Sequence, residues 1–146
     1  YEYYPTKIEE PYITRRRVCG KALYSALNIQ REDIEKRKDQ WMKNYHSFDA
    51  PVALYFFIDG ILETGSWVDC GMSIQNVMLA ARGHGLETCA QAALAEYPDV
   101  VRSILDIPDS KKLICGMALG HADYDDASYQ YRTEREPVKA FTTWFN

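Results

Sequence analysis

The chain of 146 residues lacks an apolar run long enough to cross a membrane, and it shows no signal peptide. Its four cysteines stand alone, and none belongs to a CxxC pair. This spacing argues against a metal site and against a disulfide framework. Because free thiols are typical of a reducing compartment, we expect a cytoplasmic protein without a membrane partner.

An excess of basic charge is also missing. Residues 1–50 hold ten Lys or Arg against eight Asp or Glu, and residues 51–146 hold seven against thirteen. Neither half is basic enough to favour nucleic acid. His46, His84 and His121 are isolated and lack the spacing of metal ligands, so we expect no metal.

The size and composition indicate one globular domain covering residues 1–146. Hydrophobic residues make up 47% and charged residues 26%, which suffices for a real core. Residues 1–14, rich in Tyr and Pro, are predicted to form an extended lead-in that packs on another surface, for which a partner subunit is one candidate. The first residue is Tyr1 rather than Met, so we expect the natural chain to begin earlier.

The stretch 65–89 reads as one long helix with a defined start and stop. Ser66 is a candidate N-cap, and Asp69 three residues later completes a capping-box pattern. Apolar residues then recur at helical spacing, and Gly83 and Gly85 offer the left-handed conformation that commonly ends a helix. Since few charges interrupt it, we expect this helix to be buried on most sides.

Five other segments carry clear patterns. Residues 50–59 and 112–121 are near-continuous apolar runs, which predict buried strands. Residues 98–105 predict a short helix that starts at Pro98. Residues 15–28 and 31–45 predict two further helices. The Arg15–Arg17 run is interpreted as a solvated or ion-paired helix start.

The residues of the long helix carry a family resemblance. Asp69, Gly71, the pair 75–76, the pair 80–81 and the segment 85–89 resemble the central helix of the FMN-dependent nitroreductase family. The apolar strand at 50–59, the helix-to-strand order over 98–121 and the motif 135–137 are similar to that family as well. The resemblance implies an α+β fold with a mixed sheet flanked by helices, built as an intertwined homodimer in which the tail 138–146 docks on the partner.

The resemblance also implies a cofactor and a chemistry. An FMN enzyme of this type takes a hydride from NADH or NADPH at flavin N5 and reduces a nitroaromatic, quinone or similar small acceptor. No catalytic side chain is named by it. Carried over position by position, it places backbone donors for the flavin at Ala90, Gln91, Ala92 and Ala93. It places phosphate-binding guanidinium groups at Arg135, with Arg132 as helper.

Other interpretations of the same residues stay open. Residues 90–95 could simply begin another helical turn, and both arginines could pair with Asp123, Asp125, Asp126 or Glu134 at the surface. The family's N-terminal arginine motif and the loop that holds the ribityl end of FMN have no counterpart here. The rival functions are therefore flavin reduction, reductive dehalogenation, or a non-catalytic fragment that does not bind FMN.

Overall fold

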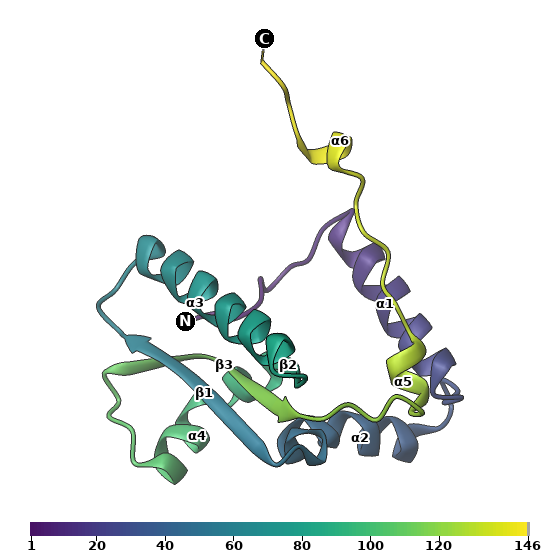
Figure 1. Ribbon diagram of the computed structural model, residues 1–146, viewed down its shortest axis with the longest axis horizontal. Coiled ribbons are helices and arrows are strands. Elements are labelled where there is room, and N and C mark those ends of the chain that lie inside the picture. The colour runs from purple at the N-terminus through teal and green to yellow at the C-terminus, as the bar shows by residue number, and fades with distance from the viewer. Residues whose placement is uncertain (146) are drawn as a thin grey trace. The chain divides into compact units, whose positions relative to one another are not determined.

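The computed structural model describes residues 1–145 and divides into two compact units. Unit 1 comprises Tyr1–Lys7 and Asp33–Ala122, and unit 2 comprises Ile8–Glu32 and the segment that begins at Asp123. In chain order the elements are α1 (Tyr12–Ala26), α2 (Ile34–Met42), the 3-10 helix η1 (Lys43–Asp49), β1 (Val52–Asp59), α3 (Thr64–Gly83), β2 (Glu87–Gln91), the 3-10 helix η2 (Ala92–Glu96), α4 (Pro98–Leu105), β3 (Lys111–Gly120), α5 (Ala127–Gln130) and α6 (Val138–Phe141) (Figure 1).

The sheet of unit 1 has three strands in the order β1-β3-β2. The two apolar runs became β1 and β3 within two residues of their predicted bounds, so the α+β class is confirmed. Both pairings among residues 1–145 are antiparallel, so the expected mixed sheet is seen here only in its antiparallel part. The edge strand β2 was not predicted. The long-helix pattern had been extended to residue 89, whereas the helix ends at Gly83.

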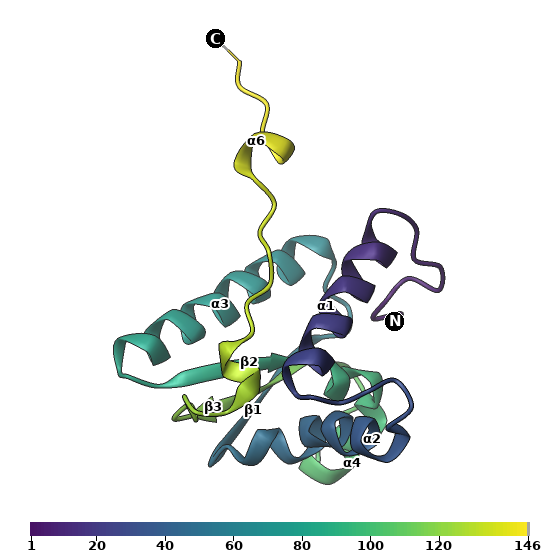
Figure 2. The ribbon, with the colours of Figure 1, turned by 90° about the vertical axis from the view of Figure 1, so that its right-hand side faces the viewer.

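A β-bulge decides which side chains of β3 face which layer. Phe56 of β1 lies opposite Cys115, and the next residue, Phe57, lies opposite Leu113, so Ile114 is the extra residue. Cys115 and Phe56 consequently pack in the cluster that includes α3, whereas Leu113 and Phe57 pack in the cluster that includes η2 and α4. Figures 1 and 2 show α3 on one face of the sheet and α4 on the other.

Helix α3 differs from its prediction at its start and in its burial. It begins at Thr64 with Glu63 at the N-cap position, and no side chain caps it. The predicted cap Ser66 lies inside the first turn, where its amide donates to the Glu63 carbonyl at 3.0 Å. The predicted stop signal is confirmed although the helix ends earlier than residue 89, because Gly85 adopts φ +74° directly after it.

Only Ile74 and Ala81 of α3 are buried, so the expected burial on most sides is wrong for this chain. Val68, Met72 and Leu79 expose 56%, 56% and 61% of their surface. The sheet covers one side of the helix, and nothing among residues 1–145 buries these three side chains.

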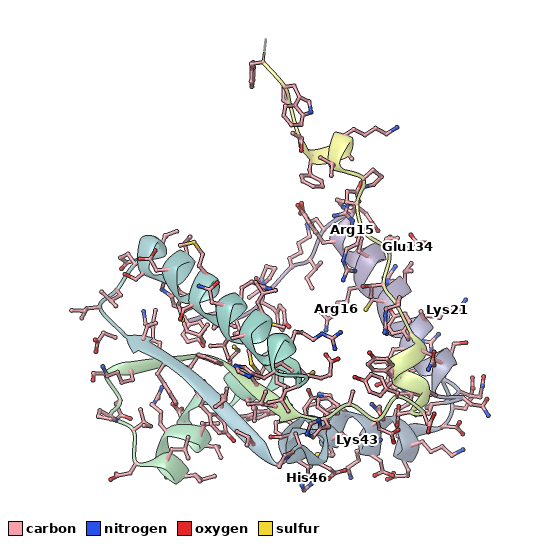
Figure 3. The ribbon with its side chains drawn as sticks, in the orientation of Figure 1. Arg15, Arg16, Lys21, Lys43, His46 and Glu134 are labelled. Carbon is pink, nitrogen blue, oxygen red and sulfur yellow. The ribbon has the colours of Figure 1, made fainter. Side chains whose placement is uncertain are left out.

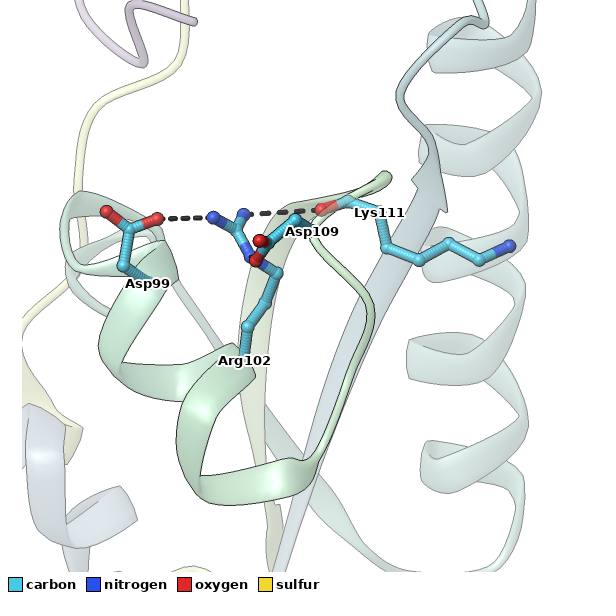
Figure 4. Close-up of polar contacts among 4 residues, drawn as sticks. All are labelled: Asp99, Arg102, Asp109 and Lys111. Atoms are coloured by element: carbon cyan, nitrogen blue, oxygen red, sulfur yellow. Dashed lines mark hydrogen bonds and ion pairs between the residues drawn. The ribbon is translucent and has the colours of Figure 1, made fainter.

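Arg102 ties α4 to the start of β3 (Figure 4). Its guanidinium donates to the Lys111 carbonyl at 3.3 Å and pairs with Asp99 one turn back on α4. Asp109 lies 3.6 Å from its Nε, which is an ion-pair distance rather than a hydrogen bond. The helix itself matches the prediction: Pro98 occupies its first turn, and Asp106 ends it in the left-handed conformation.

The predicted lead-in at 1–14 is only partly correct. Helix α1 already starts at Tyr12, because Arg15 and Ile13 bond back to carbonyls of residues 9–11. The first tyrosines pack on unit 1 itself: the Tyr1 ring meets Trp67 edge-on at 5.2 Å, and Tyr3 packs against the buried cluster beside α4. These contacts cover the rings only in part, because Tyr1 still exposes 51% of its surface.

Unit 2 is held together by contacts between α1 and the C-terminal segment. Arg15 pairs with Glu136 at 2.7 Å, and the Tyr131 hydroxyl donates to the Cys19 carbonyl at 3.1 Å. Figure 3 shows Arg15 and Arg16 on α1 with Glu134 on the neighbouring segment. The ion-paired interpretation of the arginine run is confirmed for Arg15.

Candidate functional site

The segment predicted to supply backbone donors for the flavin is the junction between β2 and η2. Ala90 and Gln91 end β2, opposite Met117 and Gly116 of β3, and Ala92 and Ala93 open η2. The alternative of a helical turn holds from Ala92 onward, whereas Ala90 and Gln91 belong to a strand. Pairing with β3 draws the first two residues into the sheet, a long-range effect that local sequence does not report.

The Gln91 side chain lies inside the protein and not at a surface. It is 2% exposed, and its Nε2 donates to the Asn44 carbonyl of η1 at 2.6 Å. Its Oε1 is buried without a hydrogen-bond partner among the described residues. This hydrogen bond joins residues that are 47 positions apart in the sequence, and no sequence pattern predicts it. The only hint in the sequence is a polar glutamine between alanines, which does not indicate its partner.

Close packing at Gly116 seats η2 on the sheet. Leu94, the residue after Ala93, is 7% exposed and lies directly over Gly116, where an added Cβ would collide with its side chain. Ala95 beside it is also buried. The backbone that follows Ala93 therefore has little freedom to move, because its side chains fill the space above a glycine.

A cavity of about 350 Å³ opens beside η2, between η1, β1 and α4. Its walls are aliphatic and tyrosine side chains, among them Leu94, Tyr45 and Tyr97. The Tyr45 hydroxyl is buried without a hydrogen-bond partner in the part of the chain described. Burial, together with nearby Tyr97 and Glu96, raises the pKa of Tyr45, so its hydroxyl is protonated at neutral pH. A volume of this order suits a small, mainly apolar group.

The two predicted phosphate ligands belong to unit 2. Arg132 donates to the carbonyls of Tyr129 and Tyr131, and its guanidinium lies 4.7 Å from the centre of the Tyr129 ring. Arg135 donates to the Thr133 carbonyl at 3.1 Å and to the Thr133 hydroxyl. Both side chains are exposed, and these bonds use Nη1 of each. The structure brings Ala90–Ala93 together in unit 1 and the two arginines together in unit 2.

The residues present fit FMN in three respects. The amides of Ala92 and Ala93 open a helix, where backbone N–H groups have no carbonyl acceptor within the helix. The buried Oε1 of Gln91 is a hydrogen-bond acceptor at this junction that receives no donor from the described residues. Each exposed arginine retains guanidinium edges suited to phosphate oxygens. Among residues 1–145, no cluster of His, Cys, Asp and Glu could hold a metal ion.

The chain was compared with known proteins. The model of the Nitroreductase family matches residues 13–121. The nitrobenzene nitroreductase of Ectopseudomonas oleovorans is 38% identical over 144 residues, which is 99% of this chain and 63% of that protein. A 4-nitrobenzoate reductase of Pseudomonas putida is 35% identical over 138 residues, which is 94% of this chain and 61% of that protein. The chain thus spans less than two thirds of the length of these relatives.

Solved structures agree with the sequence matches. The FMN and NADPH-dependent nitroreductase NfnB from sphigopyxis sp. strain HMH superposes with a TM-score of 0.95 at 36% identity, covering 100% of this chain and 66% of that one. NfnB from Mycobacterium smegmatis, in complex with NADPH, gives a TM-score of 0.90 at 28% identity and covers 67% of that chain. The family match over residues 13–121 and these whole-chain similarities show that the chain belongs to the nitroreductase family.

Proposed function

We propose that this chain forms part of an FMN-dependent NAD(P)H oxidoreductase that reduces small nitroaromatic compounds. The observation that carries the proposal is the similarity along the whole chain to NfnB, a nitroreductase named as FMN and NADPH-dependent. The relatives named for nitrobenzene and 4-nitrobenzoate support an aromatic nitro compound as the acceptor. Quinone-like acceptors belong to the same proposal, because a reduced flavin can also donate to them.

The chain's own residues would bind and orient the cofactor. Backbone amides along Ala90–Ala93 would donate to the ring system, and Arg132 and Arg135 would bind the phosphate through paired N–H donors. When bound, FMN would supply the redox chemistry by accepting a hydride from NADH or NADPH at N5 and passing electrons to the acceptor. The side chains need no nucleophile or acid–base pair for this, which agrees with the absence of such a set from the sequence.

The active form is proposed to be a homodimer in which residues 1–146 contribute a single domain. The family match at 13–121 includes parts of both compact units, which supports one domain. Val68, Met72 and Leu79 form an exposed apolar stripe on α3, and Phe141 and Trp144 near the end of the chain are 68% and 79% exposed. Exposed apolar surface of this kind commonly marks an interface. A cytoplasmic location stays a prediction, and no helix among residues 1–145 is long and apolar enough to span a membrane.

An anaerobic visible spectrum of the purified chain with FMN tests the proposal. Binding shifts and sharpens the flavin band, NADH or NADPH bleaches it, and nitrobenzene restores it. Arg135→Gln should weaken FMN binding, whereas Arg17→Gln, which changes another exposed arginine of unit 2, should not. A chain that takes up no FMN would leave the non-catalytic alternative. Bleaching that only free flavin or a haloaromatic reverses would favour flavin reduction or dehalogenation.

A further inference from the structure

We infer that Gln91 is a positioning residue whose side-chain amide holds the backbone of Ala92 and Ala93 in place by bonding to η1. The ordering of this backbone is a property of the chain alone. Its consequence for FMN affinity rests on the proposed function. The role differs from the one expected from sequence, in which Gln91 contributes a backbone donor and its side chain has no part.

Burial sets Gln91 apart from its neighbours. It is the one polar side chain among residues 1–145 that is buried, at 2% exposure, while Ala90 before it is exposed and Ala92 after it is half-buried. Burying an amide costs free energy unless it makes hydrogen bonds. The 2.6 Å bond from Nε2 to the Asn44 carbonyl supplies one such contact and joins the end of β2 directly to η1.

The segment on the other side of this bond is one that needs an anchor. Ser47, Phe48 and Asp49 at the end of η1 have φ values of 50°, 52° and 60°, the left-handed region that residues with a Cβ disfavour. Such a conformation persists only where surrounding contacts hold it. Asn44 lies three residues before this turn. It accepts from Gln91 through its carbonyl and donates through its side chain to the Trp41 carbonyl at 3.0 Å.

These contacts place Gln91 between two segments that both need to be held in position. On one side lies a strained turn that would relax if released. On the other lies the pair of alanines whose backbone must keep its orientation to donate to a ligand. Leu94 over Gly116 holds the far end of this pair, and Gln91 holds the near end. Loss of the amide donor would free the near end while leaving β2 paired with β3.

Two substitutions at Gln91 test the inference in the full chain without cofactor. Gln91→Met removes the donor while keeping a long side chain, and the amides of residues 94–96, which carry the hydrogen bonds of η2, should exchange with solvent about tenfold faster, as expected for the loss of one hydrogen bond. In Gln91→Glu the protonated carboxyl can donate to the Asn44 carbonyl, whereas the carboxylate cannot. Because burial raises the pKa of a carboxyl group, exchange in this variant, corrected for its intrinsic pH dependence, should be near wild type at pH 5. At pH 8 exchange should be at least as fast as in Gln91→Met, because a buried carboxylate also lacks solvation.

FMN affinity, measured by fluorescence titration, is the second readout. The dissociation constant should rise about tenfold in Gln91→Met and follow the same pH pattern in Gln91→Glu. Gln130→Met is the matched control, because Gln130 makes the same kind of bond, from Nε2 to the Tyr124 carbonyl at 2.9 Å, on the surface of unit 2. Ile74→Ala controls for general destabilisation, since it opens the core on the α3 face of the sheet, in a cluster that contains no residue of η1 or η2.

The outcomes separate this inference from the proposed function. Unchanged exchange at residues 94–96 in both Gln91 variants overturns the positioning role, whatever FMN does. An equal rise in exchange in Ile74→Ala overturns it too, because the effect would then report stability alone. A wild-type chain that binds no FMN, while Gln91→Met still loosens the junction, contradicts the proposed function and leaves the positioning role standing.

Discussion

Replacing Gly116 by Ala should destabilise the protein through one identifiable collision. The new Cβ would overlap the side chain of Leu94, which is 7% exposed, so Leu94 would have to shift within the core or towards the cavity that it lines. Overpacking of this kind costs about 1–3 kcal/mol. With an unfolding slope of about 2 kcal/mol per molar urea, the midpoint should fall by about 0.5–1.5 M.

A double-mutant cycle shows whether the collision is the cause. Leu94→Ala alone should cost about 2–4 kcal/mol, because it leaves a cavity over β3. In the double mutant the new methyl group occupies part of that space, so the combined loss should fall short of the sum of the single losses by about 1–2 kcal/mol. Gly71→Ala is the control, since an added Cβ on α3 meets nothing within 4 Å and should stabilise slightly. Additive losses from Gly116→Ala and Leu94→Ala would refute the packing argument.

Three further predictions concern stability, pH and assembly. Arg102→Met should lower the free energy of unfolding by about 1–2 kcal/mol, because the bond to the Lys111 carbonyl is lost, whereas Asp109→Asn should have almost no effect because Asp109 is fully exposed; equal losses in urea denaturation would contradict this. Burial, and then the neighbouring Cys70, raises the pKa of the Cys115 thiol above its unfolded value. The stability from this thiol is therefore complete below the ordinary thiol pKa and lost as pH rises through the folded pKa, so the urea midpoint should fall above about pH 8.5 and fall less in Cys115→Ala. Met72→Glu should change the sedimentation of the protein from that of a dimer to that of a monomer, whereas Ile104→Glu on α4 should not. If the Met72→Glu variant is still a dimer, α3 does not form the interface.

Local sequence predicted most elements correctly, for reasons that are themselves local. Continuous apolar runs produced β1 and β3, and the helix that starts at Pro98 has the predicted bounds. Gly85 takes the left-handed conformation expected of it, because a residue without Cβ adopts it at little cost. The start of α3 was wrong because two residues with good capping side chains, Ser66 and Asp69, lie inside the helix instead of before it.

The family resemblance proposed which residues form the candidate site, but it did not predict their secondary structure. Residues 90–93 were singled out, yet their division between an edge strand and a 3-10 helix depends on pairing with β3. The bond from Gln91 to Asn44 joins residues far apart in the chain, and the collision partner of Gly116 is likewise known only once η2 lies over the sheet. Contacts between residues so far apart in the chain produce no local pattern in the sequence from which they could be predicted.

The sequence by itself determined the family, the α+β class and the position of the two central strands, because hydrophobic periodicity and short motifs are read along the chain. Only the tertiary structure decided which residues of those strands face which layer. One extra residue, Ile114, moves Leu113 and Cys115 to opposite sides of the sheet, since side chains alternate strictly and a shift of one position reverses the face. The same dependence on pairing buries Gln91 and leaves the neighbouring Ala90 in solvent.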